Sequence, residues 1–365
     1  MIREVLVVGA GFSGSVVAER LAASGVPIRL IEKRDHVGGN AYDEFDQFGV
    51  LVHRYGPHVF HTNAARIHEY LSRFTEWIPY EHRVLSAVDD LLLPFPINRR
   101  TINSLYNLQL DEEELRAFFE KIREKRETIK NSEDVVLSTV GRELCDKFYR
   151  GYTLKQWGLD LASLGPEVAG RVKVRLNDDD RYFEDSFQGI PRNGYTAMFK
   201  NMLDHPLISL ELATDYKDVK HPEAYAHIVY TGPIDQFFGL AYGSLPYRSL
   251  RFEFEHFSRS RYQSVGTVNF PNAYDFTRVT EFKHLTGQQH PGTTIVREYP
   301  FDGGEEYYPV PTVESRRTAK MYTDLAASSK GVTLVGRLAQ YRYYNMDQAV
   351  AAALSAATTI SMKRI

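Results

Sequence analysis

The first forty residues show a strand, a helix and a second strand in their hydrophobic pattern. Residues 5–8 are a short run of valine and leucine, typical of a strand buried on both faces. After a group of glycines, Val17 and Leu21 recur at the spacing of one helical face. Residues 28–31 form a second apolar run, which Glu32 closes. The pattern therefore predicts a β-α-β unit near the start of the chain.

The last forty residues also predict a strand and a helix. Residues 332–335 have the pattern of a strand, Gly336 and Arg337 follow it, and a helical pattern begins at about Met346. The N-terminus of such a helix can return to a cofactor held by the first unit, and Arg337 is then either a cofactor ligand or an ordinary surface arginine. We expect the two ends of the chain to form one domain, with the middle inserted into it.

The middle of the chain changes from a helical to an alternating pattern. Residues 111–130 and a segment from Ser132 onward carry apolar side chains at helical spacing. Gly151 and Gly158 are expected to break the second of these helices. Between residues 248 and 308, short alternating segments are separated by Pro, Gly and Asn, which is typical of an antiparallel sheet.

Composition and charge restrict the function classes. The chain has 365 residues, of which 43% are hydrophobic and 25% charged, enough for the cores of two or three domains. With 44 basic and 47 acidic side chains the formal net charge is −3, which argues against a nucleic-acid-binding protein. The single cysteine, Cys145, excludes an intramolecular disulfide and a cysteine-rich metal site. No signal peptide follows Met1 and no stretch is apolar enough to span a membrane, so we expect a soluble, cytoplasmic protein.

The first glycine-rich turn carries the fingerprint of dinucleotide binding. Gly9, Gly11 and Gly14 follow a strand and open a helix with the spacing Gly-x-Gly-x-x-Gly. The first glycine permits the tight turn, the second lets the backbone approach a pyrophosphate, and the third lets the helix pack on the strand. Glu32, at the end of the second strand, can accept ribose hydroxyls. A bound dinucleotide is therefore expected at this turn.

A second pair of glycines favours FAD as that dinucleotide. Gly38 and Gly39 follow Glu32 and let another loop approach the phosphates and ribityl chain of a long cofactor. No second Gly-x-Gly-x-x-Gly motif is present to hold a nicotinamide cofactor. The expected fold is α/β: a Rossmann-like FAD-binding domain with an inserted helical subdomain and an antiparallel β-sheet domain. The expected ranges are 1–75, 194–240 and 315–365 for the FAD-binding domain, 98–185 for the helical subdomain with a mobile lid, and 76–97 and 241–314 for the sheet domain.

Two other segments are candidates for chemistry. His58 and His61 lie on a tight turn that leads into a strand; they lack a third ligand for a metal and are either a structural pair or neighbours of a flavin. Residues 148–158 are rich in aromatic side chains, which either pack in the core or line a cleft where a uracil ring stacks on Tyr152 or Phe148. No Ser-His-Asp arrangement, paired-carboxylate motif or P-loop is evident. The flavin therefore becomes the main candidate for the reactive group.

Six segments together resemble one flavoenzyme family. They are GAGFSG, EKRDHVGGN, YGPHVFHT, FYRGYTLKQWG, EYYPVP and VGRLAQYRYYNMDQA. The first is shared by many flavoproteins, whereas YTLKQWG and YYNMDQ are far more particular. Because they extend from one end of the chain to the other, the chain as a whole resembles the UDP-galactopyranose mutases of the bacterial type.

The resemblance implies an isomerase that interconverts UDP-galactopyranose and UDP-galactofuranose with no net oxidation or reduction. FAD is then needed in its reduced form, because its electron-rich N5 attacks the anomeric carbon as UDP leaves. The covalent flavin–galactose adduct opens to an iminium, and the sugar recloses through another hydroxyl. The implied partners are the two sugar nucleotides and an external electron donor that reduces FAD. Neither nucleic acid nor a membrane span is implied, and a homo-oligomer is expected.

The resemblance also assigns individual residues. Arg171 and Arg278 would clamp the diphosphate and stabilise the departing UDP, and His61 would lie against the flavin. From the residues alone, Arg171 is a solvated charge in a glycine-containing, charged segment that resembles a lid. The substrate would be bound by Phe148, Tyr149, Tyr152, Thr153, Trp157, Tyr182, Asn269, Tyr308 and Tyr343. FAD would be bound by Gly9, Gly11, Phe12, Ser13, Gly14, Glu32, Lys33, Gly39, Asn40, His58, Arg337, Met346 and Asp347.

Departures from the family pattern and two rival functions accompany this interpretation. Leu154 stands where a basic residue is common in the family, and Tyr308 rather than Tyr307 is taken as the phosphate ligand. An FAD-dependent amine oxidase-like oxidoreductase shares the cofactor fold, but it would need a hydrophobic tunnel or a nicotinamide partner. A non-catalytic sugar-nucleotide-binding or flavin-binding module would bind UDP without isomerising the sugar.

Overall fold

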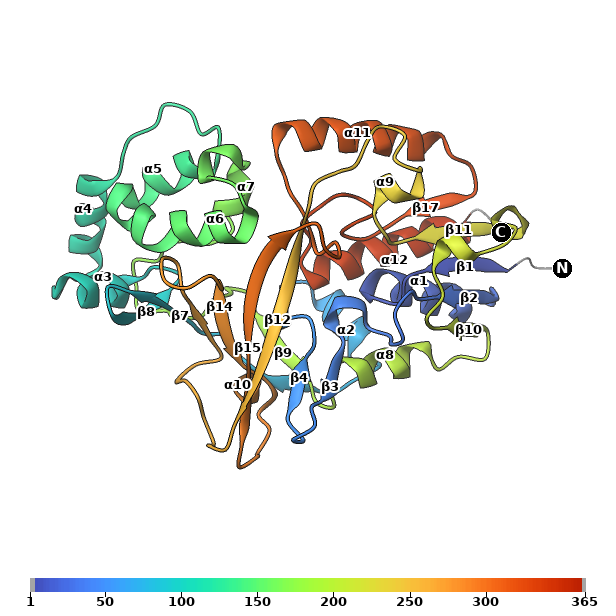
Figure 1. The fold of residues 1–365 in the computed structure, drawn as a ribbon, viewed down its shortest axis with the longest axis horizontal. Helices are drawn as coiled ribbons and strands as arrows, with labels where there is room; N and C mark the ends of the chain where they lie inside the picture. Colours follow the sequence, from blue (N-terminus) through green and yellow to red (C-terminus); the bar gives the residue numbers. More distant parts are fainter. Residues whose placement is uncertain (1–3, 363–365) are drawn as a thin grey trace.

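A five-stranded parallel sheet joins the two ends of the chain (Figure 1). The computed structural model describes residues 4–362, so Met1, on which the signal-peptide prediction rests, lies outside the described residues. The strands, in order across the sheet, are β10 (Ile208–Glu211), β2 (Ile28–Ile31), β1 (Val5–Val8), β11 (His227–Tyr230) and β17 (Val332–Leu334). All neighbouring strands are parallel, which confirms the β-α-β unit and the return of the C-terminal segment to it.

Helices from four separate segments of the chain share one core with this sheet. They are α1 (Phe12–Ala23), α2 (Ala65–Leu71), α8 (Tyr195–Leu203) and α12 (Met346–Met362). Val17 and Leu21, predicted to face inward, are fully buried in one core with Val350 and Ala353 of α12. Burying such aliphatic side chains contributes roughly 1.5–3 kcal/mol each before the entropy cost of ordering them. The same core therefore holds the start and the end of the chain together.

A seven-stranded sheet forms the second part of the molecule. Its strands, in order, are β16 (Tyr308–Pro309), β12 (Tyr247–Phe257), β15 (Thr293–Asp302), β14 (Arg278–Glu281), β13 (Thr267–Asn269), β7 (Val84–Val88) and β8 (Leu91–Phe95). The antiparallel sheet predicted between residues 248 and 308 is confirmed. The pairing of β13 with β7 is parallel and was not predicted. Such a pairing of distant segments leaves no local signal in the sequence.

The third part is helical and lies beside the seven-stranded sheet (Figure 1). Its helices are α3 (Arg99–Tyr106), α4 (Glu112–Ile122), α5 (Ser132–Leu144), a π-helical turn (Cys145–Arg150), α6 (Gly151–Trp157) and α7 (Pro166–Ala169). Capping boxes begin α3 and α4. The helix predicted over residues 111–130 is shorter, because the chain becomes extended at Arg123.

The prediction that Gly151 breaks a helix is wrong. Gly151 has helical dihedral angles, and a side chain there would meet the oxygens of Asn272 and Pro271. This position requires a glycine because another loop packs against it. The helical dihedrals are instead interrupted at Gly141, where φ is +76° and a Cβ would lie 2.2 Å from the carbonyl oxygen of Ile122. Gly158, with φ of +66°, ends α6 as predicted.

The remaining elements are two small sheets and several further helices. The remaining strands are β3 (Asp43–Phe45) and β4 (Leu51–His53) in one sheet, and β5 (Phe60–Thr62), β9 (Phe187–Pro191) and β6 (Trp77–Pro79) in another. The remaining α-helices are α9 (Ile234–Phe237), α10 (Phe282–Thr286) and α11 (Val313–Ser328). The 3₁₀-helices are Gly39–Ala41, Leu161–Ser163, Tyr216–Asp218 and Pro222–Ala224.

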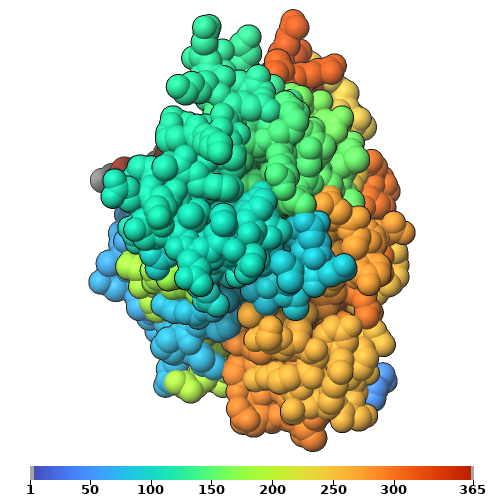
Figure 2. All heavy atoms as spheres, turned by 90° about the vertical axis from the view of Figure 1, so that its left-hand side faces the viewer, coloured from blue at the N-terminus to red at the C-terminus, as the bar shows by residue number. Residues whose placement is uncertain are grey.

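Figure 2 shows the face formed by the helical part. The teal residues of α3, α4 and α5 cover the upper half of this face, and the orange strands of the seven-stranded sheet lie below and to the right. Within residues 4–362, no helix combines the length and the apolar character that a membrane span requires.

Candidate active site

The glycine turn after β1 leaves no room for a Cβ at Gly9 or Gly14. At Gly9, where φ is +98°, a Cβ would lie 2.1 Å from Oγ1 of Thr231. At Gly14 a Cβ would lie 1.8 Å from the carbonyl oxygen of Gly9. Gly11 caps α1 without a side-chain hydrogen bond, so the amides of the first helical turn are available to a ligand. The turn is therefore shaped by its backbone, as the fingerprint predicts.

The second glycine pair packs directly against this turn. A Cβ on Gly39 would lie 3.0 Å from Cα of Gly11, so the two backbones approach as closely as expected. Glu32 is buried, and its carboxylate accepts hydrogen bonds from the backbone amides of Ala10, at 2.7 Å, and Arg34, at 3.0 Å. These bonds hold the carboxylate beside the glycine turn, where a ribose would be bound.

The other residues predicted to bind the cofactor have varied surroundings. Phe12 packs edge-on against Phe199 in the core, with ring centroids 4.9 Å apart. Lys33 pairs with Glu305 at 3.1 Å, and Oδ1 of Asn40 accepts a hydrogen bond from Arg34 at 2.9 Å. Ser13 adjoins Gly336, where a Cβ would meet its hydroxyl at 2.8 Å, so the end of β17 reaches the glycine turn. Asp347, at the start of α12, accepts a hydrogen bond from Thr62 at 3.0 Å.

A cavity of about 1210 Å³ lies where the three parts of the molecule meet. It is large enough for a sugar nucleotide together with part of a flavin. All nine residues predicted to bind substrate line it. So do Arg171, Arg278 and His61, and His58, Arg337 and Met346 from the predicted cofactor set. The predicted cofactor residues that do not line it are Gly9, Gly11, Phe12, Ser13, Gly14, Glu32, Lys33, Gly39, Asn40 and Asp347.

Arg171 and Arg278 reach the cavity from different kinds of structure: Arg171 follows a short helix, and Arg278 lies in a strand. Arg171 follows the short helix α7 and is exposed; its guanidinium lies 4.2 Å from the ring centroid of Tyr343 and donates to the carbonyl oxygen of Tyr343 at 3.2 Å. Arg278 belongs to β14, and its Nε lies 2.9 Å from Oε2 of Glu298, which is fully buried. Burial opposes the charge of Arg278, but the carboxylate of Glu298 raises its pKa, so the guanidinium is retained as a cation.

Aromatic side chains form one wall of the cavity. The ring centroid of Tyr343 lies 5.7 Å from that of Trp157 and 5.3 Å from that of Tyr308. Burial raises the pKa of Tyr308 to about 12, so its hydroxyl remains a hydrogen-bond donor at neutral pH. Tyr307, the alternative phosphate ligand, is not part of the cavity lining. Tyr149 is almost fully buried and contacts Phe95, with ring centroids 5.7 Å apart.

Helix α6 is tied to the strand that carries Arg278. The ammonium group of Lys155 donates to the carbonyl oxygens of Ala273, Tyr274 and Phe276, at 3.0–3.2 Å, in the loop before β14. Lys155 therefore connects the aromatic-rich segment at residues 148–158 to the loop that leads into the strand of Arg278. The adjacent Leu154, which departs from the family pattern, is half exposed and therefore lies at the surface.

The two histidines have distinct partners. Burial lowers the pKa of His58 to about 3, so it is neutral, and its Nδ1 lies 2.9 Å from the carbonyl oxygen of Gly56. Nδ1 of His61 lies 2.7 Å from Oδ2 of Asp185, and its ring stacks on Phe183 with centroids 3.7 Å apart. Neither Asp185 nor Phe183 was predicted from the sequence. The dense run of acidic residues just before them in the chain was the only sequence feature nearby that drew attention to this segment.

Two family models match the chain. A UDP-galactopyranose mutase model matches residues 147–343, more than half of the chain, and an NAD(P)-binding Rossmann-like domain model matches residues 7–74. The chain belongs to the UDP-galactopyranose mutase family. The family and its dinucleotide-binding domain together indicate a flavin cofactor, and the protein is an isomerase of the mutase type. The glycine turn, its uncapped helix N-terminus and the buried carboxylate of Glu32 fit such a cofactor.

Similar proteins cover nearly the whole chain. It is 39% identical to the "Probable UDP-galactopyranose mutase" of Klebsiella pneumoniae over 97% of this chain and 94% of that protein. It is 34% identical to the dTDP-fucopyranose mutase of Escherichia coli over 98% of each. A crystal structure of reduced UDP-galactopyranose mutase matches with a TM-score of 0.80 at 16% identity, over 99% of this chain and 94% of that one, and shows the shared fold.

Proposed function

We propose that this mutase interconverts UDP-galactopyranose and UDP-galactofuranose on reduced FAD. The observation that carries the proposal is the convergence of Arg171, Arg278 and His61 on one cavity with the tyrosines and Trp157. An oxidase of hydrophobic amines would have no use for two arginines at this place. A diphosphate requires them, because its charge must be balanced in a buried site.

The arginines and tyrosines bind and orient the diphosphate. Arg278 is held in the sheet by Glu298, which keeps its guanidinium directed into the cavity as a fixed cation. Arg171 adds a second cation from the segment after α7 and stabilises charge on the departing UDP. The hydroxyl of Tyr308 donates to the phosphates, and Trp157 lies beside it as a surface for the uracil ring.

The residues around the glycine turn hold FAD. Backbone amides at the start of α1 would bind the pyrophosphate, Glu32 would accept from the ribose, and Arg337 with His58 would contact the part of the cofactor inside the cavity. When bound and reduced by an external electron donor, the flavin supplies the nucleophile that this chain's side chains lack. His61 lines the same cavity, where it would lie against the flavin and orient it.

A second substrate pair deserves a direct test, because the dTDP-fucopyranose mutase of Escherichia coli is also related over the full length of the chain. The two pairs differ in a methyl group on the base, in the 2′-hydroxyl of the ribose and in the sugar. The base methyl group alone changes binding by only about 1–3 kcal/mol, so discrimination between the two pairs rests mainly on the 2′-hydroxyl and the sugar.

The experiment compares both sugar nucleotides on one preparation. Dithionite-reduced protein is incubated anaerobically with UDP-galactofuranose or with dTDP-fucofuranose, and the products are separated by chromatography while the flavin spectrum is followed. Higher kcat/KM for the uridine compound, with the flavin remaining reduced, supports the proposal. Higher kcat/KM for the thymidine compound would make the dTDP-sugar the preferred substrate in place of the UDP-sugar. Flavin oxidation or reduction in step with substrate consumption supports the oxidoreductase.

A further inference from the structure

His61 is held on two sides by one segment of the chain, residues 182–186. Phe183 stacks on its ring at 3.7 Å with an angle of 14° between the planes, and Asp185 lies 2.7 Å from Nδ1. His61 is 8% exposed and lines the cavity. Within residues 4–362, no side chain or backbone group is hydrogen-bonded to its other ring nitrogen, Nε2. The imidazole is therefore fixed at Nδ1 and open at Nε2.

The position of the proton between Nδ1 of His61 and Asp185 follows from the neighbouring hydrogen bonds of Asn63. The backbone amide of Ser186 donates to Oδ1 of Asn63 at 2.9 Å, so the amide nitrogen of Asn63 faces the other way. That nitrogen donates to Oδ1 of Asp185 at 2.8 Å. A carboxylate accepts at both oxygens, so Nδ1 of His61 must be the donor to Oδ2. In the neutral imidazole Nδ1 carries the proton and Nε2 carries the lone pair.

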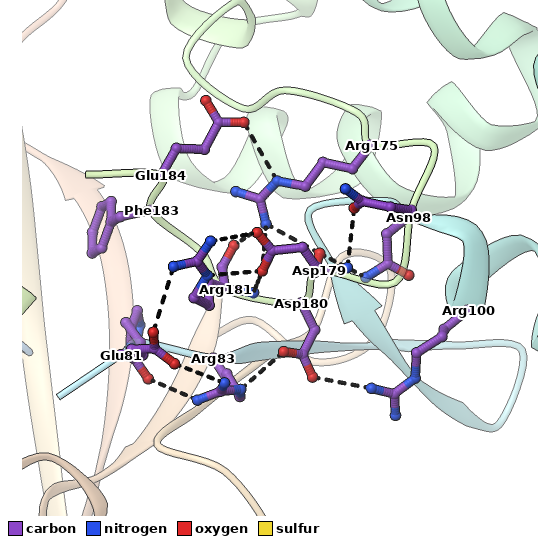
Figure 3. Close-up of polar contacts among 12 residues, drawn as sticks. Glu81, Arg83, Asn98, Arg100, Arg175, Asp179, Asp180, Arg181, Phe183 and Glu184 are labelled. Atoms are coloured by element: carbon purple, nitrogen blue, oxygen red, sulfur yellow. Dashed lines mark hydrogen bonds and ion pairs between the residues drawn. The ribbon is translucent and has the colours of Figure 1, made fainter. Parts of the chain in front are cut away.

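The segment that bears Phe183 and Asp185 is itself anchored (Figure 3). Nη1 of Arg175 donates to the carbonyl oxygen of Asp179 at 3.1 Å, and Asp180 pairs with Arg83 at 2.9 Å and with Arg100 at 3.2 Å. At the other end, the side-chain amide of Gln188 donates to the carbonyl oxygens of Phe183, at 3.1 Å, and Asp185, at 3.3 Å. Each exposed ion pair contributes little alone, but a network holds the backbone in one path. Asp185 is thus presented to His61 by a fixed segment.

We propose that Asp185 is a positioning residue of the mutase reaction: with Asn63 it fixes the Nδ1-protonated tautomer of His61, so that Nε2 accepts a hydrogen bond from the bound reduced flavin. The inference rests on the proposed function. A reduced flavin carries N–H groups that an acceptor at Nε2 stabilises, whereas a donor at Nε2 would favour the oxidised ring. The tautomer of His61 therefore acts on the redox state of the cofactor as well as on its orientation.

The substitution Asp185→Asn tests the assignment without changing the shape of the side chain. Asn63 still donates, so the amide oxygen at residue 185 stays on its side and the amide nitrogen faces Nδ1 of His61. Nδ1 must then accept, and the proton moves to Nε2. In the double variant Asn63→Ala/Asp185→Asn the amide is free to turn its oxygen toward His61, which restores the original tautomer. Asn63→Ala alone is the matched control and keeps Asp185 as the acceptor.

The tautomer is measured by ¹⁵N NMR of ring-labelled histidine in the FAD-bound protein, with the signal of His61 assigned by its loss in His61→Phe. We expect protonated Nδ1 in the wild type, in Asn63→Ala and in the double variant, and protonated Nε2 in Asp185→Asn. The last variant should show about tenfold lower kcat, the equivalent of one hydrogen bond. It should also show a lower flavin reduction potential, an unchanged KM and unchanged flavin content. The double variant should recover most of the kcat.

An unchanged tautomer in Asp185→Asn overturns the inference, whatever the activity. An inverted tautomer with unchanged kcat and unchanged potential overturns it too, because Nε2 would then not face the reacting groups. Failure of the proposed function has a different signature: the wild type itself would convert neither sugar nucleotide, while the NMR and potential measurements would still report on His61.

Discussion

The cofactor end and the substrate end of the active site are built in different ways. At the cofactor end, closely packed backbone makes most of the site: Gly9, Gly11 and Gly14 lie within six residues, and Gly39 packs against Gly11. At the substrate end, side chains from separate segments converge on the cavity; Arg171 comes from the helical part and Arg278 from the sheet. A side chain that enters the glycine turn should therefore prevent cofactor binding. A substitution in the cavity should remove only the contacts that this one residue makes with the substrate.

This difference predicts that substitutions will separate cofactor binding from catalysis. A change at the glycine turn should remove the flavin, and a change in the cavity should leave the flavin bound while activity or substrate binding falls. The following predictions test the separation.

The largest effect is expected at Gly14. In Gly14→Ala the new Cβ would lie 1.8 Å from the carbonyl oxygen of Gly9, a backbone atom that cannot move without shifting the turn. We expect a loss of stability of about 3 kcal/mol or more and little bound flavin. Gly11→Ala is the matched comparison, because its Cβ has only ordinary contact with Gly39, at 3.6 Å. It should retain the melting temperature but bind flavin weakly, as measured by absorbance per protein. Full flavin content in both variants would contradict the backbone account.

The two arginines should differ although both serve the substrate. Arg171→Ala should lower kcat/KM about 10²–10³-fold with flavin content and stability unchanged, because an exposed cation is lost. Arg278→Ala should lower activity as much and also destabilise the protein by about 3–5 kcal/mol, because Glu298 is left buried without its cation.

The variant Arg278→Ala/Glu298→Gln removes that unpaired charge and should recover part of the stability but none of the activity. Chemical denaturation and steady-state kinetics on the same preparations check both statements. Full activity in Arg171→Ala would eliminate the role assigned to that residue.

Acid should destabilise the seven-stranded sheet at Glu281, the last residue of β14. Burial alone would raise the pKa of this carboxyl, but hydrogen bonds from His284, Thr293 and the backbone amides of Tyr262 and Gln263 lower it to about 2. A carboxyl whose folded pKa is depressed stabilises the fold above its unfolded pKa of about 4.3 and loses that contribution as the pH falls through 2.

Glu281→Gln should therefore cost about 2–3 kcal/mol at pH 7, and the gap to the wild type should close between about pH 5 and pH 2. The exposed substitution Glu314→Gln is the control and should change stability by less than about 0.5 kcal/mol. Denaturant midpoints across this pH range measure the gap. A gap that stays constant would show that folding does not lower the pKa of this carboxyl.

The smallest effect is expected at Trp157. Trp157→Ala should weaken UDP binding by about 1–3 kcal/mol, the contribution of stacking one base on an aromatic ring, and leave flavin absorbance unchanged. Trp157→Phe should retain most of the affinity. Titration calorimetry with UDP measures the difference. A flavin-free protein on purification would instead assign the indole to the core, where it contacts Leu164 and Val310.

The sequence predicts the cofactor end far better than the substrate end, for a physical reason. A strand, three glycines, a helix and Glu32 are neighbours in the chain, so their spacing alone carries the geometry. The convergence of the substrate residues is encoded in tertiary packing, and there the family resemblance supplied what periodicity did not. Asp185 shows the limit: it contacts a histidine 124 positions away, and no local pattern reports such a contact.

The two helix-breaking predictions show the same limit on a smaller scale. Gly158 has the positive φ that ends a helix, a property that local propensity captures. Gly151 is a glycine because a distant loop presses on it, and local propensity then predicts the wrong structure. Glycines selected by packing and glycines selected by dihedral angle are indistinguishable in a single sequence.

The central claim is that a reduced flavin drives an isomerisation with no net redox change. The most direct measurement incubates the purified, flavin-bound protein with UDP-galactofuranose, with and without dithionite, and resolves the products by chromatography. The account predicts UDP-galactopyranose only in the reduced sample, with many turnovers per flavin and no change in its redox state. No conversion in either sample, or one flavin oxidised or reduced for each substrate consumed, would contradict it.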